Sequence, residues 1–75
     1  MEMTTIAHWW NGRIEPAERA EVIVRHNPSG SYEVQVTVAG RDALVEHLTR
    51  AKAEALAAEL TGKPGWVQVE VQRVG

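Results

Sequence analysis

Histidines and acidic residues are the side chains of this sequence most able to bind a metal ion or to transfer a proton. His8, His26 and His47 lie on three separate segments, without the close spacing that brings two ligands to one metal ion. Cysteine is absent, which excludes a thiolate site. The acidic run over residues 15–21 lacks the Asp-rich pattern of a calcium loop. We therefore expect neither a metal site nor a bound cofactor.

Serine and glycine patterns that accompany catalysis are missing as well. Ser29 and Ser31, the two serines of the chain, lie in or beside the turn over residues 27–30 and not in a Gly-x-Ser-x-Gly elbow. No glycine-rich loop that could cradle a phosphate opens the helix predicted below. We therefore expect that the chain is not an enzyme.

The three tryptophans have the greatest potential for binding. Trp9 and Trp10 are neighbours in a predicted strand, where successive side chains point to opposite faces, so they cannot enter the same core. By the same alternation, Trp66 falls on the polar side of the last predicted strand. Because clusters of exposed aromatic residues are typical of interaction sites, we predict a contact patch on the sheet face that the helix leaves open. The predicted contact residues are Trp9, Trp10, Ile23 and Trp66.

Length, charge and composition narrow the class of protein. The 75 residues suit a single small α+β domain over residues 1–75, with a thin core. A formal net charge of -2 and a pI near 5.9 disfavour a general nucleic-acid binder. The chain has no apolar run long enough to span a membrane and no signal peptide, and together with the absence of cysteine this predicts a cytoplasmic protein.

A helix is predicted over Thr49–Leu60, with the sequence TRAKAEALAAEL. Its alanines, leucines and charged residues have high helix propensity, and no β-branched residue follows Thr49 within it. Thr49 suits the N-cap, while Gly62 and Pro64 are stop signals after the last turn. The apolar positions have the i, i+3, i+4, i+7 spacing of a buried stripe, and they are Ala53, Leu56, Ala57 and Leu60.

The start of this helix leaves an alternative open. Asp42 could also cap a helix, which would then run through Leu44 and Leu48. At about 100° per residue, these two leucines fall outside the stripe of the later turns, so one continuous helix would need two apolar faces. We prefer a short strand at Arg41–His47, followed by a helix that starts at Thr49.

Alternation of apolar and polar residues predicts the strands. The clearest strand is Ser31–Ala39, and Thr4–Trp10 and Glu21–His26 precede it. Asn11-Gly12, directly after the first strand, favours a two-residue hairpin. We predict a small antiparallel or mixed sheet of four or five strands with one helix packed on one face, in the order β-β-β-(β)-α-β.

The last predicted strand, Trp66–Arg73, follows the helix. Val67 and the later valines of this strand are expected to face the core, and Gln68 and its polar neighbours to face water. TRAKAEALAAEL, a glycine turn and a Val-x-Val strand are together similar to half of the bacterial sporulation-related repeat domain, which binds peptidoglycan. The resemblance covers residues 49–71 and one of the two helices of that domain. It assigns no binding residue to this sequence.

These features predict a small non-enzymatic module that binds a protein partner or a second copy of itself through the open sheet face. Six arginines against two lysines, with ten alanines, suggest a GC-rich bacterial or phage genome, in which such a module would be an accessory protein. A single-stranded nucleic-acid-binding domain that stacks bases on exposed aromatic residues is the alternative. For Trp66 alone, the alternative is a structural role at the end of a strand.

Overall fold

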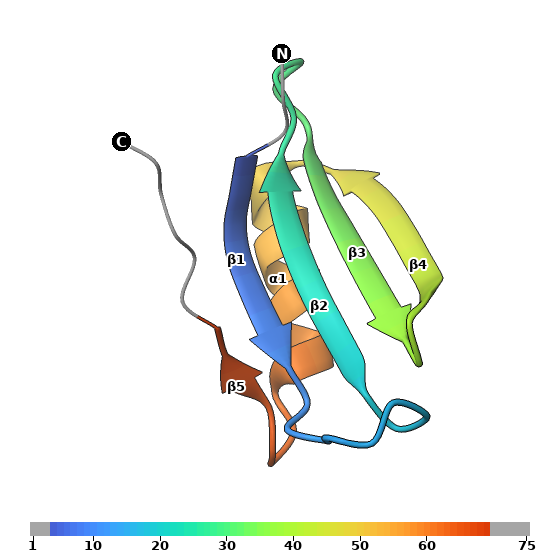
Figure 1. The fold of residues 1–75 in the computed structure, drawn as a ribbon. Coiled ribbons are helices and arrows are strands. Elements are labelled where there is room, and N and C mark those ends of the chain that lie inside the picture. The colour runs from blue at the N-terminus through green and yellow to red at the C-terminus, as the bar shows by residue number, and fades with distance from the viewer. Residues whose placement is uncertain (1–3, 70–75) are drawn as a thin grey trace.

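Five strands and one helix follow one another along residues 4–69, the part of the chain that this computed structural model describes (Figure 1). All strand pairs are antiparallel, and the sheet order is β4-β3-β2-β1-β5. The predicted α+β class, with one helix after the fourth strand, is confirmed. The elements are β1 (Thr4–Trp10), β2 (Ala20–His26), β3 (Tyr32–Val38), β4 (Arg41–Leu48), α1 (Arg50–Thr61) and β5 (Val67–Gln68).

The helix begins where the shorter of the two predictions places it. Thr49 is the N-cap, with φ of -70° and ψ of 163°, and its hydroxyl accepts a hydrogen bond from the Lys52 amide at 3.4 Å. The alternative helix from Asp42 is wrong, because β4 pairs Leu44 with Val36 and thereby turns this leucine toward the helix side of the sheet. Within the described residues, α1 is the only helix, and it is neither long nor apolar enough to cross a membrane.

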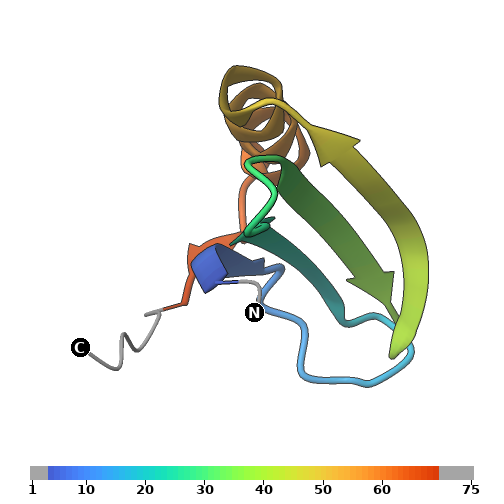
Figure 2. The same ribbon diagram turned by 90° about the horizontal axis from the view of Figure 1, so that it is seen from above.

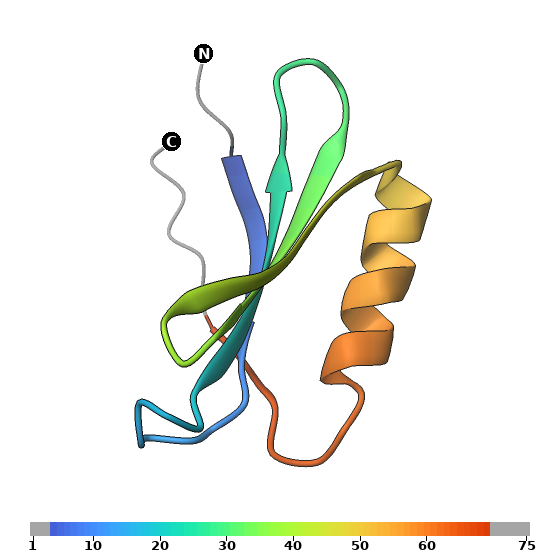
Figure 3. The same ribbon diagram turned by 90° about the vertical axis from the view of Figure 1, so that its right-hand side faces the viewer.

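The core lies between α1 and the middle of the sheet. Figure 3 shows α1 standing on one side of the strands, and the predicted stripe of α1 faces them. Alanine at the contact lets the helix axis approach the sheet closely, because no longer side chain separates the two backbones. Among residues 4–69, the apolar residues that are at most 2% exposed are Val22, Val24, Val34, Ala53 and Ala57.

The two-residue hairpin of this fold lies between β3 and β4. Val38 pairs with Arg41, and the residues between them, Ala39 and Gly40, have φ of 54° and 78°. Positive φ at both central residues is what a type I′ turn requires, and the twist of that turn matches the twist of the flanking strands.

The prediction of a two-residue hairpin at Asn11-Gly12 is wrong. The chain instead forms a loop over residues 11–19, in which the Asn11 side-chain amide donates to the Glu18 carbonyl at 2.8 Å. Gly12 has φ of 78°, and a Cβ atom added there would lie 2.8 Å from the Gly65 carbonyl oxygen. Glycine at this position therefore allows two loops to approach each other closely, because any side chain would clash there. No local sequence pattern predicts this contact.

β5 turns its side chains to the opposite faces from those predicted. Val67 pairs with Trp10 on the side away from α1 and is 53% exposed, while Gln68 pairs with Trp9 on the helix side. Trp66 packs against the core instead. The larger apolar side chain takes the core side, and the alternation of the strand then directs Val67 outward. The predicted strand residues 70–73 lie outside the described residues.

Candidate interaction surfaces

The sheet separates the two neighbouring tryptophans. Trp10 pairs with Glu21 and Trp9 pairs with Val22, which is a core residue under α1. Paired residues share a face, so Trp9 lies on the helix side and Trp10 on the opposite side, which we call the open face. The prediction that these two residues cannot enter the same core is confirmed.

An apolar patch on the open face spans β5, β1 and β2. Val67 pairs with Trp10, and Ile23 lies two residues along β2 from Glu21, the residue opposite Trp10. We call Trp10, Ile23 and Val67 the open-face patch. Trp10 and Ile23, two of the four predicted contact residues, therefore lie together on this face. The other two, Trp9 and Trp66, pack against the core from the helix side.

Trp10 also supports the loop over residues 11–19. Its indole Nε1 donates a hydrogen bond to the Arg13 carbonyl at 3.1 Å, and the guanidinium carbon of Arg19 lies 5.3 Å from the ring centroid. A cation above the face of an indole ring is attracted by its π electrons. Substitution of Trp10 would disturb these contacts, so Ile23 and Val67 are the better probes of the patch.

Side chains of both charge signs surround the open-face patch. His8 Nε2 lies 3.1 Å from Glu21 Oε1, and Arg25 Nη1 lies 3.7 Å from Glu33 Oε1. Glu33 is only 7% exposed, so the nearby Arg25 offsets part of the cost of removing this carboxylate from water. Among the described residues, the open face therefore carries charges of both signs.

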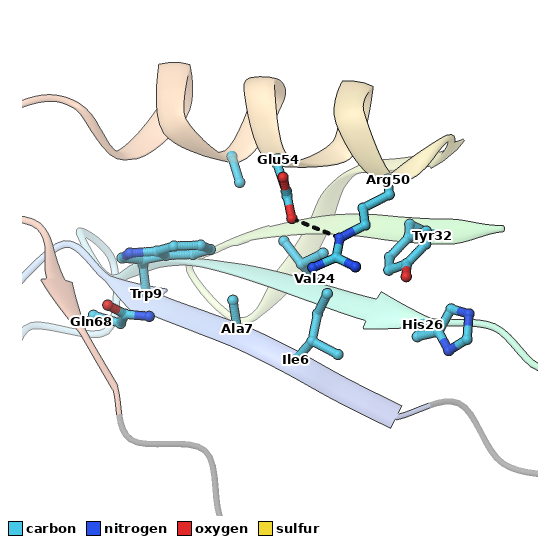
Figure 4. A pocket seen from close by; sticks show the side chains of 10 residues that line it. Ile6, Ala7, Trp9, Val24, His26, Tyr32, Arg50, Glu54 and Gln68 are labelled. Atoms are coloured by element: carbon cyan, nitrogen blue, oxygen red, sulfur yellow. Dashed lines mark hydrogen bonds and ion pairs between the residues drawn. The ribbon is translucent and has the colours of Figure 1, made fainter. Parts of the chain in front are cut away.

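On the helix side, a groove runs beside α1. The helix packs mainly on β2, β3 and β4, and Figure 2 shows β1 and β5 lying farther from it. We call this space the helix-side groove; its volume is about 410 Å³. Figure 4 shows the side chains that line it. Its apolar lining consists of Ile6, Ala7, Trp9, Val24 and Ala57.

Polar side chains lie at the rim of the helix-side groove. Arg50 and Glu54, one turn apart on α1, form an ion pair with 3.0 Å between Arg50 Nε and Glu54 Oε1 (Figure 4). The hydrogen bond and the negative charge of Glu54 raise the pKa of Arg50 above its ordinary value. His26 and Tyr32 lie at the same end, with ring centroids 4.7 Å apart, and Gln68 lies beside Trp9 at the other end.

The histidines stay apart in the fold. His8 and His47 are on the open face, on β1 and β4, while His26 lines the helix-side groove. Across residues 4–69, no group of three or more histidine, aspartate or glutamate side chains could hold a metal ion.

The sequence pattern does not identify the residues of the helix-side groove. The available signal is the number of elements, since a helix about 10 Å wide covers two or three strands that are spaced about 4.8 Å apart. One helix beside four or five strands therefore implies an uncovered part of the helix side. Which strands stay uncovered depends on the sheet order and on where the helix lies.

The resemblance of residues 49–71 to the sporulation-related repeat domain extends to one helix and the start of one strand. That domain has two helices, whereas residues 4–69 contain α1 alone. The likeness therefore describes a local arrangement. No protein-family model, curated protein or solved structure matches the chain.

Proposed function

We propose that this chain is a small, non-enzymatic protein-interaction module that binds through the open face of its sheet. The observation that carries the proposal is the grouping of Trp10, Ile23 and Val67 on one face, with Val67 53% exposed. Large apolar side chains gathered on a surface are typical of the centre of a protein interface. In a bacterium or phage, such a module would be a cytoplasmic accessory protein.

The partner that the charges of this face favour is a second copy of the chain. Arg19 and Arg25 lie among the carboxylates of Glu21, Glu33 and Asp42. A two-fold axis brings the same surface of both copies together, so the exposed Arg19 of one copy can meet an exposed carboxylate of the other, such as that of Asp42. A face of mixed charge with an apolar centre therefore suits self-association.

Substitution of Ile23 by lysine is expected to convert the dimer to a monomer, because a charge would then enter the apolar centre of the interface. The measurement is the solution mass, by size-exclusion chromatography with light scattering over a concentration series. Val67→Lys is the second variant, since this exposed side chain can change without disturbing the core. Circular dichroism verifies that both variants remain folded.

The matched control is Val38→Lys. Val38 is 43% exposed and lies on β3, on the helix side of the sheet, so this variant adds the same charge away from the open-face patch. Its mass should equal that of the wild type. A wild type that is monomeric at every concentration contradicts self-association. If the chain captures a cellular partner and the Ile23→Lys variant captures it equally well, the open face is not the interaction surface.

Single-stranded nucleic acid is the alternative ligand of the same face, with Trp10 as the platform on which bases stack. The carboxylates of Glu21, Glu33 and Asp42 oppose it by repelling phosphate. Fluorescence anisotropy of a mixed oligonucleotide pool at low salt distinguishes the two ligands, because binding that weakens steeply with added salt belongs to nucleic acid.

A further inference from the structure

The loop between β1 and β2 begins with the one asparagine-glycine pair of the sequence, Asn11-Gly12. In such a pair the backbone nitrogen of the glycine can attack the side-chain amide carbon of the asparagine, because glycine has no Cβ atom to block the approach. Gly12 is exposed, and within the described residues its N–H donates to no backbone oxygen. The attacking nitrogen is therefore open to water and is not held by the main chain.

The reaction that this pair allows exchanges the Asn11 side-chain amide for a carboxylate. The Gly12 nitrogen loses its proton and forms a bond to Cγ of Asn11. The bond between Cγ and Nδ2 then breaks, and Nδ2 takes up the proton and leaves as ammonia. One water molecule opens the resulting cyclic imide at either of its two carbonyl carbons. The products are aspartate, with the original main chain, and isoaspartate, whose main chain runs through Cγ.

The folded loop holds the Asn11 side chain against this reaction. Its Nδ2 donates to the Glu18 carbonyl at 2.8 Å, and its Oδ1 accepts from the Arg13 amide at 3.2 Å. Both ends of the planar amide are thereby fixed, whereas attack requires Cγ to become tetrahedral and Nδ2 to depart. The two hydrogen bonds must therefore open before Asn11 reacts.

A tight turn positions the Glu18 carbonyl that accepts the bond from Asn11. The Glu18 amide donates to the Glu15 carbonyl at 2.9 Å, which closes a β-turn over residues 15–18 with Pro16 at its second position. Proline at that position fixes φ and restricts the chain. Pro16 therefore helps to set how often the contacts of Asn11 open.

We infer that Asn11 is a site of spontaneous covalent modification, and that the loop over residues 11–19 controls its rate. Modification removes the Nδ2 donor and sets a carboxylate against the Glu18 carbonyl oxygen, so the contact that closes the loop becomes repulsive. Isoaspartate also lengthens the main chain beside Gly12, where a Cβ atom would already lie 2.8 Å from the Gly65 carbonyl oxygen. The modified loop therefore leaves its place against the turn before β5. This inference is independent of the proposed use of the open face.

The first experiment incubates the full chain in buffer and in concentrated guanidinium chloride at the same pH and temperature. Peptide mapping by mass spectrometry follows aspartate and isoaspartate at both asparagines. We expect Asn11 to react about five- to a hundredfold more slowly in the folded chain, since two ordinary hydrogen bonds must break first. Asn27 is the internal control and should stay unmodified, because it precedes Pro28, whose nitrogen has no proton to lose.

A pair of proline substitutions tests whether the loop controls the rate. Pro16→Gly loosens the turn over residues 15–18 without changing the reacting pair, so Asn11 should react about two- to fivefold faster in buffer and equally fast in denaturant. Pro28→Gly, between β2 and β3, is the matched control and should leave the rate at Asn11 unchanged. The same variant gives Asn27 a glycine neighbour, so Asn27 should then react in denaturant.

Several outcomes would overturn the inference. An Asn11 that stays unmodified in denaturant is not a reactive site. Equal rates in buffer and in denaturant, or equal acceleration by the two proline variants, would mean that the loop does not control the reaction. The isoaspartate form, separated from the unmodified chain by ion exchange, should show changed amide shifts at Gly65 and Trp66. Unchanged shifts there would contradict release of the loop.

Discussion

Replacing Ala53 with leucine is expected to lower the free energy of unfolding by about 1–3 kcal/mol. Ala53 lies on the face of α1 that packs against the valines of β2 and β3, and it is completely buried. The isopropyl group that leucine adds to its Cβ atom would push the helix away from the sheet. A chain of 75 residues has a total stability of about 4–11 kcal/mol, so this loss is a large fraction of it. Urea denaturation followed by circular dichroism measures the change.

The control for this prediction is Ala55→Leu, two residues farther along α1. Ala55 is exposed, and leucine has nearly the helix propensity of alanine, so the stability should change by less than about 0.5 kcal/mol. The same chemical change then separates packing against the sheet from helix propensity. Equal effects of the two substitutions would mean that α1 does not lie as close to the sheet as the structure has it.

Replacing Gly12 with alanine is expected to cost about 2–4 kcal/mol. Gly12 has φ of 78°, where an L-residue is disfavoured by about 1–2 kcal/mol. Its new Cβ atom would also lie 2.8 Å from the Gly65 carbonyl oxygen, a backbone atom that cannot move without shifting the turn before β5. The measurement is the midpoint of thermal or urea unfolding, together with the amide shifts of Trp66 and Val67.

Gly40→Ala isolates the conformational part of this effect. Gly40 has the same φ of 78°, but a Cβ atom there would meet nothing within 4 Å. We expect a loss of about 1–2 kcal/mol, with no shift changes at Trp66. If both substitutions lower the free energy of unfolding equally, the loop over residues 11–19 does not lie against the turn before β5. The close contact between Gly12 and Gly65 would then be contradicted.

Because the core is thin, binding of a partner should contribute measurably to the stability of the fold. The completely buried apolar residues of the described chain are valines and alanines, which bury little surface each. A partner that binds only the folded state adds stability by mass action. If the chain associates with itself through the open face, we expect its melting temperature to rise with protein concentration in the wild type and not in Ile23→Lys.

The fold was predictable because its strongest signals are local. α1 and its N-cap follow from alanine-rich propensity and from Thr49, and β3 follows from a clean alternation. The Asn11-Gly12 signal failed for a physical reason. A hairpin needs alternating apolar residues on both sides of the turn, and the charged, proline-containing loop after Gly12 cannot supply the second strand. The true hairpin, at Ala39-Gly40, has such strands on both sides.

The candidate surfaces were predictable only in part. Alternation along one strand places Trp9 and Trp10 on opposite faces whatever the sheet order, but it does not say which of them faces the core, and both were predicted to be contact residues of the open face. The side occupied by Trp66 was predicted wrongly, because the alternation within β5 says which residues share a face and not which face is the core. No pattern within one segment announces the helix-side groove, whose lining comes from β1, β2, β3, α1 and β5.

The amino-acid sequence by itself determined the local elements of this protein: a capped alanine-rich helix, the alternating strands before it, and the valines that face one side of β2 and β3. These depend on propensity and periodicity, which act between residues close in the chain. The tertiary structure alone decided the pairing of β5 with β1, the close approach of Gly12 to Gly65, and the width of sheet that α1 leaves uncovered. Register and coverage are set by contacts between distant segments, and a shift of one residue in register exchanges the two faces of a strand.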